Sequence, residues 1–331
     1  ASGGTLSNLN ALIAARNNAG LGSNPNSVLL ISEDAHSSFI KCIRIMGLDA
    51  ANLVRIKTDN QGRMDINNLR KSLNKCLIEN KKIFAIVATL GTTVRGAIDP
   101  IKEISEICKE RNIWLHIDGS IGGIFALSSI QIEGLNNINQ ANSITINPQK
   151  IIGITKTSSL LLVANMNTLQ KTFSTGLPYI SSKEDIVNRG EIGIQGSRPA
   201  EVIKLWLGLR FLGLNGIEDI LKSSIKRKDF FIDHIVKNKF EIYSGPLHIV
   251  SFIPKGLTAK DTDFWTHSKV NELMKNNYML SRPKFKGKYY LRVVMGNYNT
   301  TDSHIEELLR FLDAYQCCLL YTSPSPRDLS T

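Results

Sequence analysis

The sequence contains 331 residues, 42% of them hydrophobic, and carries a formal net charge of +11. This length and apolar content suffice for a large buried core and leave room for a second, smaller domain. No apolar run approaches the length of a membrane-spanning helix, so we expect no membrane partner.

The positive charge is densest at residues 226–228 and 283–288, in stretches that flank helices and turns as solvated faces normally do. Because no sequence signature of a nucleic-acid-binding fold accompanies this charge, we expect no nucleic-acid partner. Cys42, Cys76 and Cys108 show neither paired spacing nor a metal-binding pattern. We therefore expect no metal and a reduced, cytoplasmic location.

The chain begins with the glycine-rich stretch Ala1-Ser2-Gly3-Gly4-Thr5, which precedes apolar residues at helical spacing from Leu6 to Ile13. A glycine-rich turn that opens a helix predicts an anion site, because backbone amides can approach a phosphate and Thr5 adds a hydroxyl donor. An ordinary helix cap remains the alternative. Neither a phosphate-loop lysine nor a dinucleotide glycine motif is present, so nucleotide binding has little support.

Strand-like and helical segments then alternate along the chain. Residues 83–90 form an apolar run of strand length, residues 101–108 have helical spacing, and residues 113–118 and 143–147 are again strand-like. This order predicts an α/β fold with a mostly parallel sheet covered by helices. Ligands of such sheets gather at the carboxyl ends of the strands, where Thr92, Asp118 and Lys150 are expected to converge.

Asp118 and Lys150 each follow a predicted strand, and together they suggest a pyridoxal 5'-phosphate site. This cofactor is held as a Schiff base on a lysine, and an anion keeps its ring nitrogen protonated. A lysine after a strand is otherwise usually a solvated loop residue.

The C-terminal half predicts a second domain. After a polar, loop-like stretch at 181–185, Gln195-Gly196-Ser197-Arg198-Pro199 introduces a helix, and short strands and helices follow. We assign residues 1–203 to a large domain and 204–316 to a small α+β domain. Residues 317–331 change abruptly to a Pro/Ser-rich composition, and we expect them to be a non-native tail.

Five motifs occur in a characteristic order: Ser2-Gly3-Gly4-Thr5, Ser32-Glu33-Asp34-Ala35-His36-Ser37-Ser38, Ala88-Thr89-Leu90-Gly91-Thr92-Thr93, His116-Ile117-Asp118 and Asn147-Pro148-Gln149-Lys150. Together they resemble the group II pyridoxal-phosphate-dependent amino acid decarboxylases, which act on glutamate, cysteine sulfinate or aromatic amino acids. The resemblance extends to about Phe311. It implies the fold type I architecture, a homodimer, and decarboxylation of an L-amino acid to an amine and carbon dioxide.

The resemblance also implies roles for individual residues. Lys150 would form the Schiff base, Asp118 would pair with the pyridinium nitrogen, and His36 would stack on the ring and contact the substrate carboxylate. The phosphate would be held by Gly4, Thr5 and Asn147, with Thr92 near the ring hydroxyl. Outside this context, His36 would be interpreted as a capping or surface histidine.

Tyr179 matches the mobile-loop tyrosine of the family, 29 residues after Lys150. By resemblance, its phenol returns a proton to the substrate carbon after carbon dioxide leaves. Related aldehyde synthases replace this tyrosine, so Tyr179 and His36 favour simple decarboxylation. A tyrosine that merely packs after a proline in a loop remains the alternative.

The sequence departs from the family at three places. Gln149, which the resemblance places at the cofactor beside Lys150, stands where better-known members have histidine. Ser120 follows Gly119 where they have a pair of alanines, which puts a hydroxyl beneath the cofactor. The family also carries a segment before the phosphate motif, so we expect this chain to be a fragment.

Arg292 lies in the strand-like stretch Tyr290-Leu291-Arg292-Val293-Val294 and could bind a substrate carboxylate through two parallel hydrogen bonds. A surface salt bridge is the alternative role. We favour an acidic substrate such as glutamate. An aldehyde synthase, a carbon–carbon lyase on the same fold, or an inactive fragment that only packs as a domain remain alternative interpretations.

Overall fold

The computed structural model describes residues 1–155, 158–176 and 188–321, with side chains up to Asp313. Its residues form two compact units, 1–221 with 245–247, and 222–244 with 248–331. Helix α6 (Glu201–His234) belongs to both units and changes direction at Gly213, which has a φ of 61°. The sequence places the domain boundary earlier, between residues 203 and 204, inside the first turn of α6, and that assignment stays a prediction.

A six-stranded sheet organises the first unit, in the order β2-β1-β3-β4-β5-β6. Neighbouring strands from β2 to β5 pair in parallel, and only β6 runs antiparallel to its neighbour. The predicted α/β class with a mostly parallel sheet is therefore confirmed. The strands are β1 (Ser27–Ser32), β2 (Leu53–Ile56), β3 (Lys82–Thr89), β4 (Trp114–Gly119), β5 (Ser143–Ile146) and β6 (Leu160–Val163).

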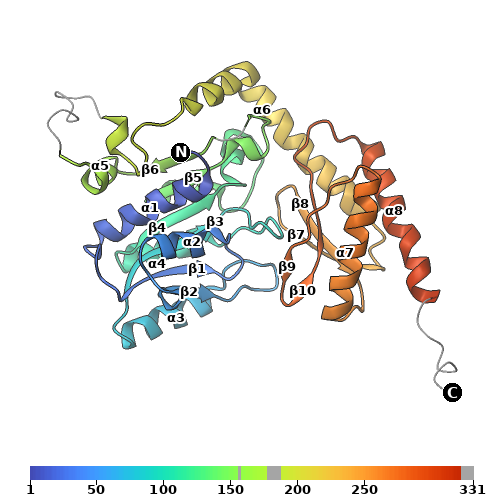
Figure 1. The fold of residues 1–331 in the computed structure, drawn as a ribbon, viewed down its shortest axis with the longest axis horizontal. Helices are drawn as coiled ribbons and strands as arrows, with labels where there is room; N and C mark the ends of the chain where they lie inside the picture. Colours follow the sequence, from blue (N-terminus) through green and yellow to red (C-terminus); the bar gives the residue numbers. More distant parts are fainter. Residues whose placement is uncertain (156–157, 177–187, 322–331) are drawn as a thin grey trace. The chain divides into compact units, whose positions relative to one another are not determined.

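Helices lie on both sides of this sheet (Figure 1). They are α1 (Gly4–Asn18), α2 (Ser38–Ile45), α3 (Ile66–Ile78), α4 (Ile101–Glu110) and α5 (Asn167–Phe173). Leu12 of α1 and Phe39 of α2 pack against Leu29 of β1 in one buried cluster. Because helices cover the sheet, strands β1, β4 and β5 are buried at every residue rather than at every second one. Short 3₁₀ helices occur at Ala50–Asn52, Gly123–Leu127, Leu135–Gln140, Pro148–Lys150 and Arg189–Glu191.

The parallel pairing brings the sequence motifs to one end of the sheet. Thr89 pairs with Asp118, and Asp118 pairs with Thr145, so strands β3, β4 and β5 end side by side. The segments that follow these strands, and the one that follows β1, carry His36, Thr92, Ser120, Asn147 and Lys150. The parallel register therefore places these residues at the carboxyl ends of the strands, where a ligand site is expected.

The second unit contains an antiparallel sheet in the order β11-β8-β7 and a two-stranded hairpin of β9 and β10. Phe252, Trp265 and Leu291 are central to its buried core. This separate small sheet with helices matches the predicted α+β domain. Its elements are β7 (Phe240–Ser244), β8 (Ile249–Pro254), α7 (Ala259–Lys275), β9 (Lys284–Phe285), β10 (Lys288–Tyr289), β11 (Leu291–Val294) and α8 (Asp302–Tyr321).

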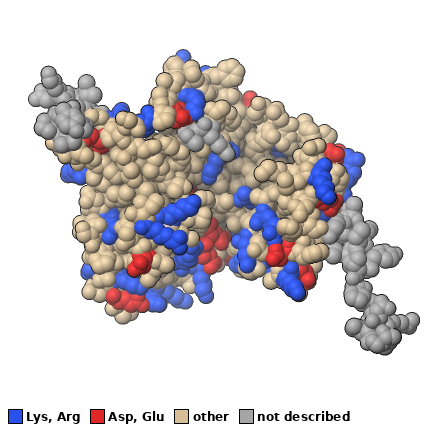
Figure 2. Space-filling model, in the orientation of Figure 1, with Lys and Arg blue, Asp and Glu red and all other residues tan. Residues whose placement is uncertain are grey.

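Lys and Arg side chains occur on both units in the face drawn in Figure 2, with Asp and Glu side chains between them. The basic excess is therefore distributed on this face rather than gathered into one stripe. None of the helices in the described part of the chain combines the length and the apolar character needed to cross a bilayer.

Candidate active site

A cavity of about 160 Å³ lies at the carboxyl ends of the parallel strands, and we call it the strand-end cavity. Its walls come from α1, β4 and the segments that follow β1, β3, β4 and β5. Seven residues predicted from the sequence line it: Gly4, Thr5, His36, Asp118, Ser120, Asn147 and Lys150. The fold thus brings together residues that are more than 140 positions apart in the sequence.

The first turn of α1 forms one wall of this cavity. Gly3 precedes the helix at a φ of 141° and supplies no side-chain cap, so the first amides of α1 have no intrahelical acceptor. A Cβ atom on Gly4 would lie 2.6 Å from Nδ2 of Asn147 and 2.8 Å from Oγ of Ser120. Only glycine permits this close approach, which leaves amide and hydroxyl donors around a space suited to an anion.

Asp118 is buried near the end of β4, and both of its carboxylate oxygens accept hydrogen bonds. Oδ1 accepts from the backbone amide of Ser120 at 3.1 Å, and Oδ2 accepts from Nδ2 of Asn8 at 3.3 Å. Lys150 ends the short 3₁₀ helix after β5, and its exposed side chain lines the same cavity.

His36 contributes an imidazole whose orientation is determined by its own loop. Nδ1 accepts a hydrogen bond from the backbone amide of Ser38 at 3.1 Å, so the neutral ring carries its proton on Nε2. Burial lowers the pKa of His36, and the nearby negative charge of Asp118 opposes this effect. A mostly neutral ring with a donor at Nε2 results.

Two predicted cofactor residues do not line the cavity. Thr92 is fully buried, and its hydroxyl accepts the backbone amide of Ala97 at 3.1 Å, which closes the loop after β3. The structure instead places the neighbouring Thr93 in the cavity wall. The side-chain oxygen of Gln149 accepts the backbone amide of Ser158, so this side chain supports a neighbouring segment.

Two further predicted residues cannot be placed at the cavity. Tyr179 lies outside the described residues. Arg292 belongs to β11 of the second unit, where its Nε donates to Oγ of Ser281 at 2.8 Å and burial lowers its pKa. Their predicted roles remain proposals.

The sequence analysis missed four polar residues of the cavity, namely Asn8, Ser38, Thr89 and Thr93. Asn8 lies one helical turn after Gly4, so helical periodicity could have found it. The hydroxyls of Ser38 and Thr89 are buried without a hydrogen-bond partner among the described residues. Such unsatisfied groups in a cavity wall are available to a polar ligand. In the described residues, no group of three or more His, Cys, Asp or Glu side chains could hold a metal ion.

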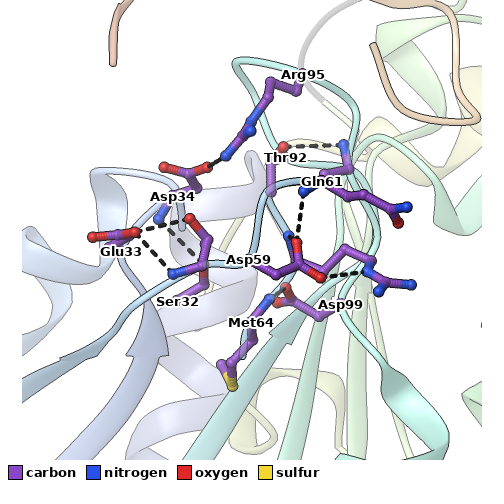
Figure 3. A network of polar contacts seen from close by, with 12 residues as sticks. Ser32, Glu33, Asp34, Asp59, Gln61, Met64, Thr92, Arg95 and Asp99 are labelled. Atoms are coloured by element: carbon purple, nitrogen blue, oxygen red, sulfur yellow. Dashed lines mark hydrogen bonds and ion pairs between the residues drawn. The ribbon is translucent and has the colours of Figure 1, made fainter. Parts of the chain in front are cut away.

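A buried ion pair joins two of the loops that carry site residues (Figure 3). The Arg95 guanidinium, from the loop after β3, lies 2.6 Å from the carboxylate of Asp34, from the loop that carries His36. The two side chains are only 2% and 7% exposed. Gly62 has a φ of 82°, and a Cβ there would lie 2.2 Å from Cζ of Arg95, so glycine makes room for the guanidinium.

Asp99 completes the polar network in Figure 3. Its carboxylate accepts the backbone amides of Met64 at 2.6 Å and Thr89 at 2.7 Å. Burial, the largest cause, raises the pKa of Asp99 to about 7 against these two hydrogen bonds. Asp99 therefore ties the loop before α3 to the end of β3, beside the strand-end cavity.

Comparisons with known proteins agree with one another. A family model described as the pyridoxal-dependent decarboxylase conserved domain matches residues 1–253. An aromatic-L-amino-acid decarboxylase of Bacillus atrophaeus is 31% identical over 321 residues, covering 94% of this chain and 66% of the relative. An acidic amino acid decarboxylase of Mus musculus is 29% identical, covering 88% of this chain and 58% of the relative.

A crystal structure of mouse CSAD in apo form superposes with a TM-score of 0.84 at 25% identity, covering 95% of this chain and 70% of that chain. The chain thus spans only 58 to 66% of the length of the two curated relatives described above. The similarity covers the sheet, the cavity and most of the second unit.

We predict that Asp34→Asn destabilises the first unit by about 3–5 kcal/mol, because it removes the carboxylate that faces the buried Arg95 guanidinium. Urea unfolding measures the change in free energy. Glu79→Gln is the control, since it neutralises an exposed carboxylate that pairs with Lys75 and Lys81, and little change is expected. Equal effects of the two substitutions would contradict the prediction.

We predict a specific acid sensitivity at His116. Burial lowers its pKa to about 4, below the ordinary 6.5, so between pH 4 and 6.5 the unfolded chain binds more protons than the folded chain. The stability contributed by the neutral ring is complete above pH 6.5 and is lost as the pH falls to 4, by about 3 kcal/mol at most.

The measurement compares wild type with His116→Gln by urea unfolding at pH 7, 5.5 and 4. The difference in unfolding free energy between the two proteins is expected to shift in favour of the glutamine variant as the pH falls. A difference that stays constant with pH would show that His116 does not titrate on unfolding in this window.

Proposed function

We infer the function of this chain from its family. The chain belongs to the pyridoxal-dependent decarboxylase family, whose model matches residues 1–253 of the 331. The proposed activity is the pyridoxal-5'-phosphate-dependent decarboxylation of an L-amino acid to the amine and carbon dioxide. One observation carries the proposal: Lys150, Asp118 and the amino end of α1 line the same cavity.

The residues of the strand-end cavity fit the cofactor group by group. The first amides of α1, the Thr5 hydroxyl and the Asn147 amide suit a phosphate. Asp118 provides an anion for the ring nitrogen, and Lys150 provides the amine that bonds to the aldehyde. The unpartnered hydroxyls of Ser38 and Thr89 offer further polar contacts to the ring substituents.

When bound, the cofactor supplies an electron sink for the electron pair that departing carbon dioxide leaves on the substrate carbon. The residues of this chain bind, orient and move protons around that chemistry. Asp118 would hold a proton at the ring nitrogen, and His36 would donate its Nε2 hydrogen to the substrate carboxylate. The Tyr179 phenol, which lies outside the described residues, returns a proton to the substrate carbon.

We predict that pyridoxal 5'-phosphate followed by borohydride adds one covalent cofactor to the wild-type chain and none to Lys150→Ala, because only Lys150 among the cavity residues has an amine. Intact mass spectrometry and absorbance of the bound cofactor measure the outcome. Lys171→Ala, which removes an exposed lysine on α5, should label like wild type. Equal labelling of Lys150→Ala and wild type by folded protein would refute the site.

For the substrate, we propose an acidic amino acid such as glutamate, with Arg292 as the partner of its side-chain carboxylate. The mouse relative is named as an acidic amino acid decarboxylase, and the Bacillus atrophaeus relative is named for aromatic substrates. Arg292 lies in β11, where its Nε donates a hydrogen bond to Oγ of Ser281. This bond restricts the orientation of the guanidinium group. A held guanidinium is suited to binding a carboxylate through two parallel hydrogen bonds.

We predict that Arg292→Gln lowers kcat/KM for L-glutamate by about tenfold or more, since a charge-assisted pair is lost. For L-phenylalanine, no comparable loss is expected. Arg282→Gln is the matched control, because Arg282 instead packs on the Tyr289 ring at 4.0 Å and bonds to Thr266. Carbon dioxide release measures both reactions, and equal losses for the two substrates would argue against a role for Arg292 in substrate choice.

The second proposed function is aldehyde synthesis on the same scaffold. Ser120 favours this second function, because it lines the cavity at a position where the family resemblance predicts an alanine. Amine with carbon dioxide as products supports decarboxylation, whereas aldehyde with hydrogen peroxide supports the synthase. We also propose, from the family resemblance, that the full-length protein is a cytoplasmic homodimer.

A further inference from the structure

A buried row of polar side chains runs from the interior of the first unit to the carboxylate of Asp118. It comprises Trp114, Ser143, His116 and Asn8, all at most 8% exposed. These residues come from β4, β5 and α1, which are the elements that build the strand-end cavity. We call this row the Asp118 donor chain.

Four contacts connect the row. Nε1 of Trp114 lies 2.8 Å from Oγ of Ser143, which lies 2.8 Å from Nδ1 of His116. Nε2 of His116 lies 3.1 Å from Oδ1 of Asn8. Nδ2 of Asn8 then lies 3.3 Å from Oδ2 of Asp118. Every link is within hydrogen-bonding distance, and every link is buried.

The chemistry of the two ends determines the direction of the hydrogens. The indole of Trp114 can only donate, so Oγ of Ser143 accepts and keeps its own hydrogen for Nδ1 of His116. At the other end, Nδ2 of Asn8 donates its hydrogen to Oδ2 of Asp118. The Asn8 oxygen therefore faces His116, whose Nε2 must carry the ring proton.

The neutral state of His116 agrees with this assignment. Burial, the largest cause, lowers the pKa of His116 to about 4, so the ring is uncharged near neutral pH. An uncharged ring protonated at Nε2 accepts from Ser143 and donates to Asn8 at the same time. All four hydrogens then point the same way, toward Asp118, and chains of aligned hydrogen bonds strengthen one another.

We propose that Asn8, His116 and Ser143 are positioning residues that hold Asp118 in the ionised state and orientation needed to keep a proton on the ring nitrogen of the cofactor. This inference rests on the proposed function. It gives a chemical role to buried residues next to the cavity. Asn8 connects α1 to the carboxylate of Asp118, and the amino end of the same helix is proposed to bind the phosphate.

The other titratable groups near Asp118 are consistent with this role. They are His36, Cys42, His116 and Lys150. Burial raises the pKa of the Cys42 thiol to about 12, so Cys42 and His116 are both neutral near pH 7. On the buried side, Asp118 is therefore stabilised by oriented hydrogens rather than by a neighbouring cation, which leaves its charge for the cofactor.

The first test measures the protonation of the His116 ring, within the Asp118 donor chain, in the absence of the cofactor. Nitrogen-15 NMR of the His116 ring in the cofactor-free chain should show Nε2 protonated and Nδ1 unprotonated near pH 7. The opposite tautomer, or a doubly protonated ring, would overturn the proposal, because Asn8 would then present its oxygen to Asp118 or the row would reverse. This result is independent of whether the chain binds pyridoxal 5'-phosphate.

The second test uses paired variants with pyridoxal 5'-phosphate labelled with nitrogen-15 in its ring. Asn8→Leu should weaken cofactor affinity by about tenfold or more and reduce protonation of the ring nitrogen. Asn10→Leu is the control, because Asn10 is also buried on α1 but accepts the backbone amide of Ile194 instead. Its ring-nitrogen signal should match that of wild type.

His116 provides a conservative rescue. His116→Gln keeps an N–H donor near the Nε2 position and should retain the ring-nitrogen signal of wild type, whereas His116→Phe removes the donor and should behave like Asn8→Leu. Unchanged ring protonation in Asn8→Leu and His116→Phe would overturn the proposal even if both variants are less stable. Failure of the wild-type chain to bind the cofactor would instead count against the proposed function. The tautomer of the His116 ring would still test the proposed direction of the hydrogen bonds in the Asp118 donor chain.

Discussion

The buried carboxylate of Asp118 is the constraint on which the rest of the site depends. An ionised carboxylate that is 4% exposed is costly unless donors surround it. Here the donors come from the Ser120 backbone and from Asn8, and the latter is itself held by His116. Because Asn8 belongs to α1 and His116 to β4, satisfying this one charge fixes the first helix against the central strand. The amino end of α1 is thereby oriented along the cavity wall.

Parallel pairing explains why distant motifs converge there. In a parallel sheet every strand ends at the same edge, so residues after β1, β3, β4 and β5 meet regardless of their separation in sequence. The pair of Arg95 and Asp34 then joins the segments after β3 and β1. His36 is therefore positioned from two directions, by the amide of Ser38 and by a buried ion pair two residues earlier in its loop.

Much of this arrangement could be predicted because it depends on local patterns. The apolar runs around Val87 and Ile117 have the length and composition of buried strands. Asp118 lies near the end of the second run, and Lys150 comes four residues after β5 ends at Ile146. Loop geometry could not be predicted in the same way. Gly91 has a φ of 101°, and the loop it opens turns Thr92 inward to Ala97, so the cavity receives Thr93. Pairs such as Arg95 with Asp34 depend on tertiary structure, which no spacing in the sequence records.

Gln149 and Ser120, the two residues that depart from better-known members of the family, lie in different surroundings. Gln149 directs its oxygen to the backbone amide of Ser158, so the loss of a titratable histidine there acts on a supporting segment. Ser120 lines the cavity, and its hydroxyl would lie 2.8 Å from a Cβ atom on Gly4. A methyl group at that position could only pack, whereas a hydroxyl can donate to an anion or to the underside of a ring. Of the two substitutions, Ser120 is therefore the one that we propose to affect cofactor placement, because its side chain lines the cavity.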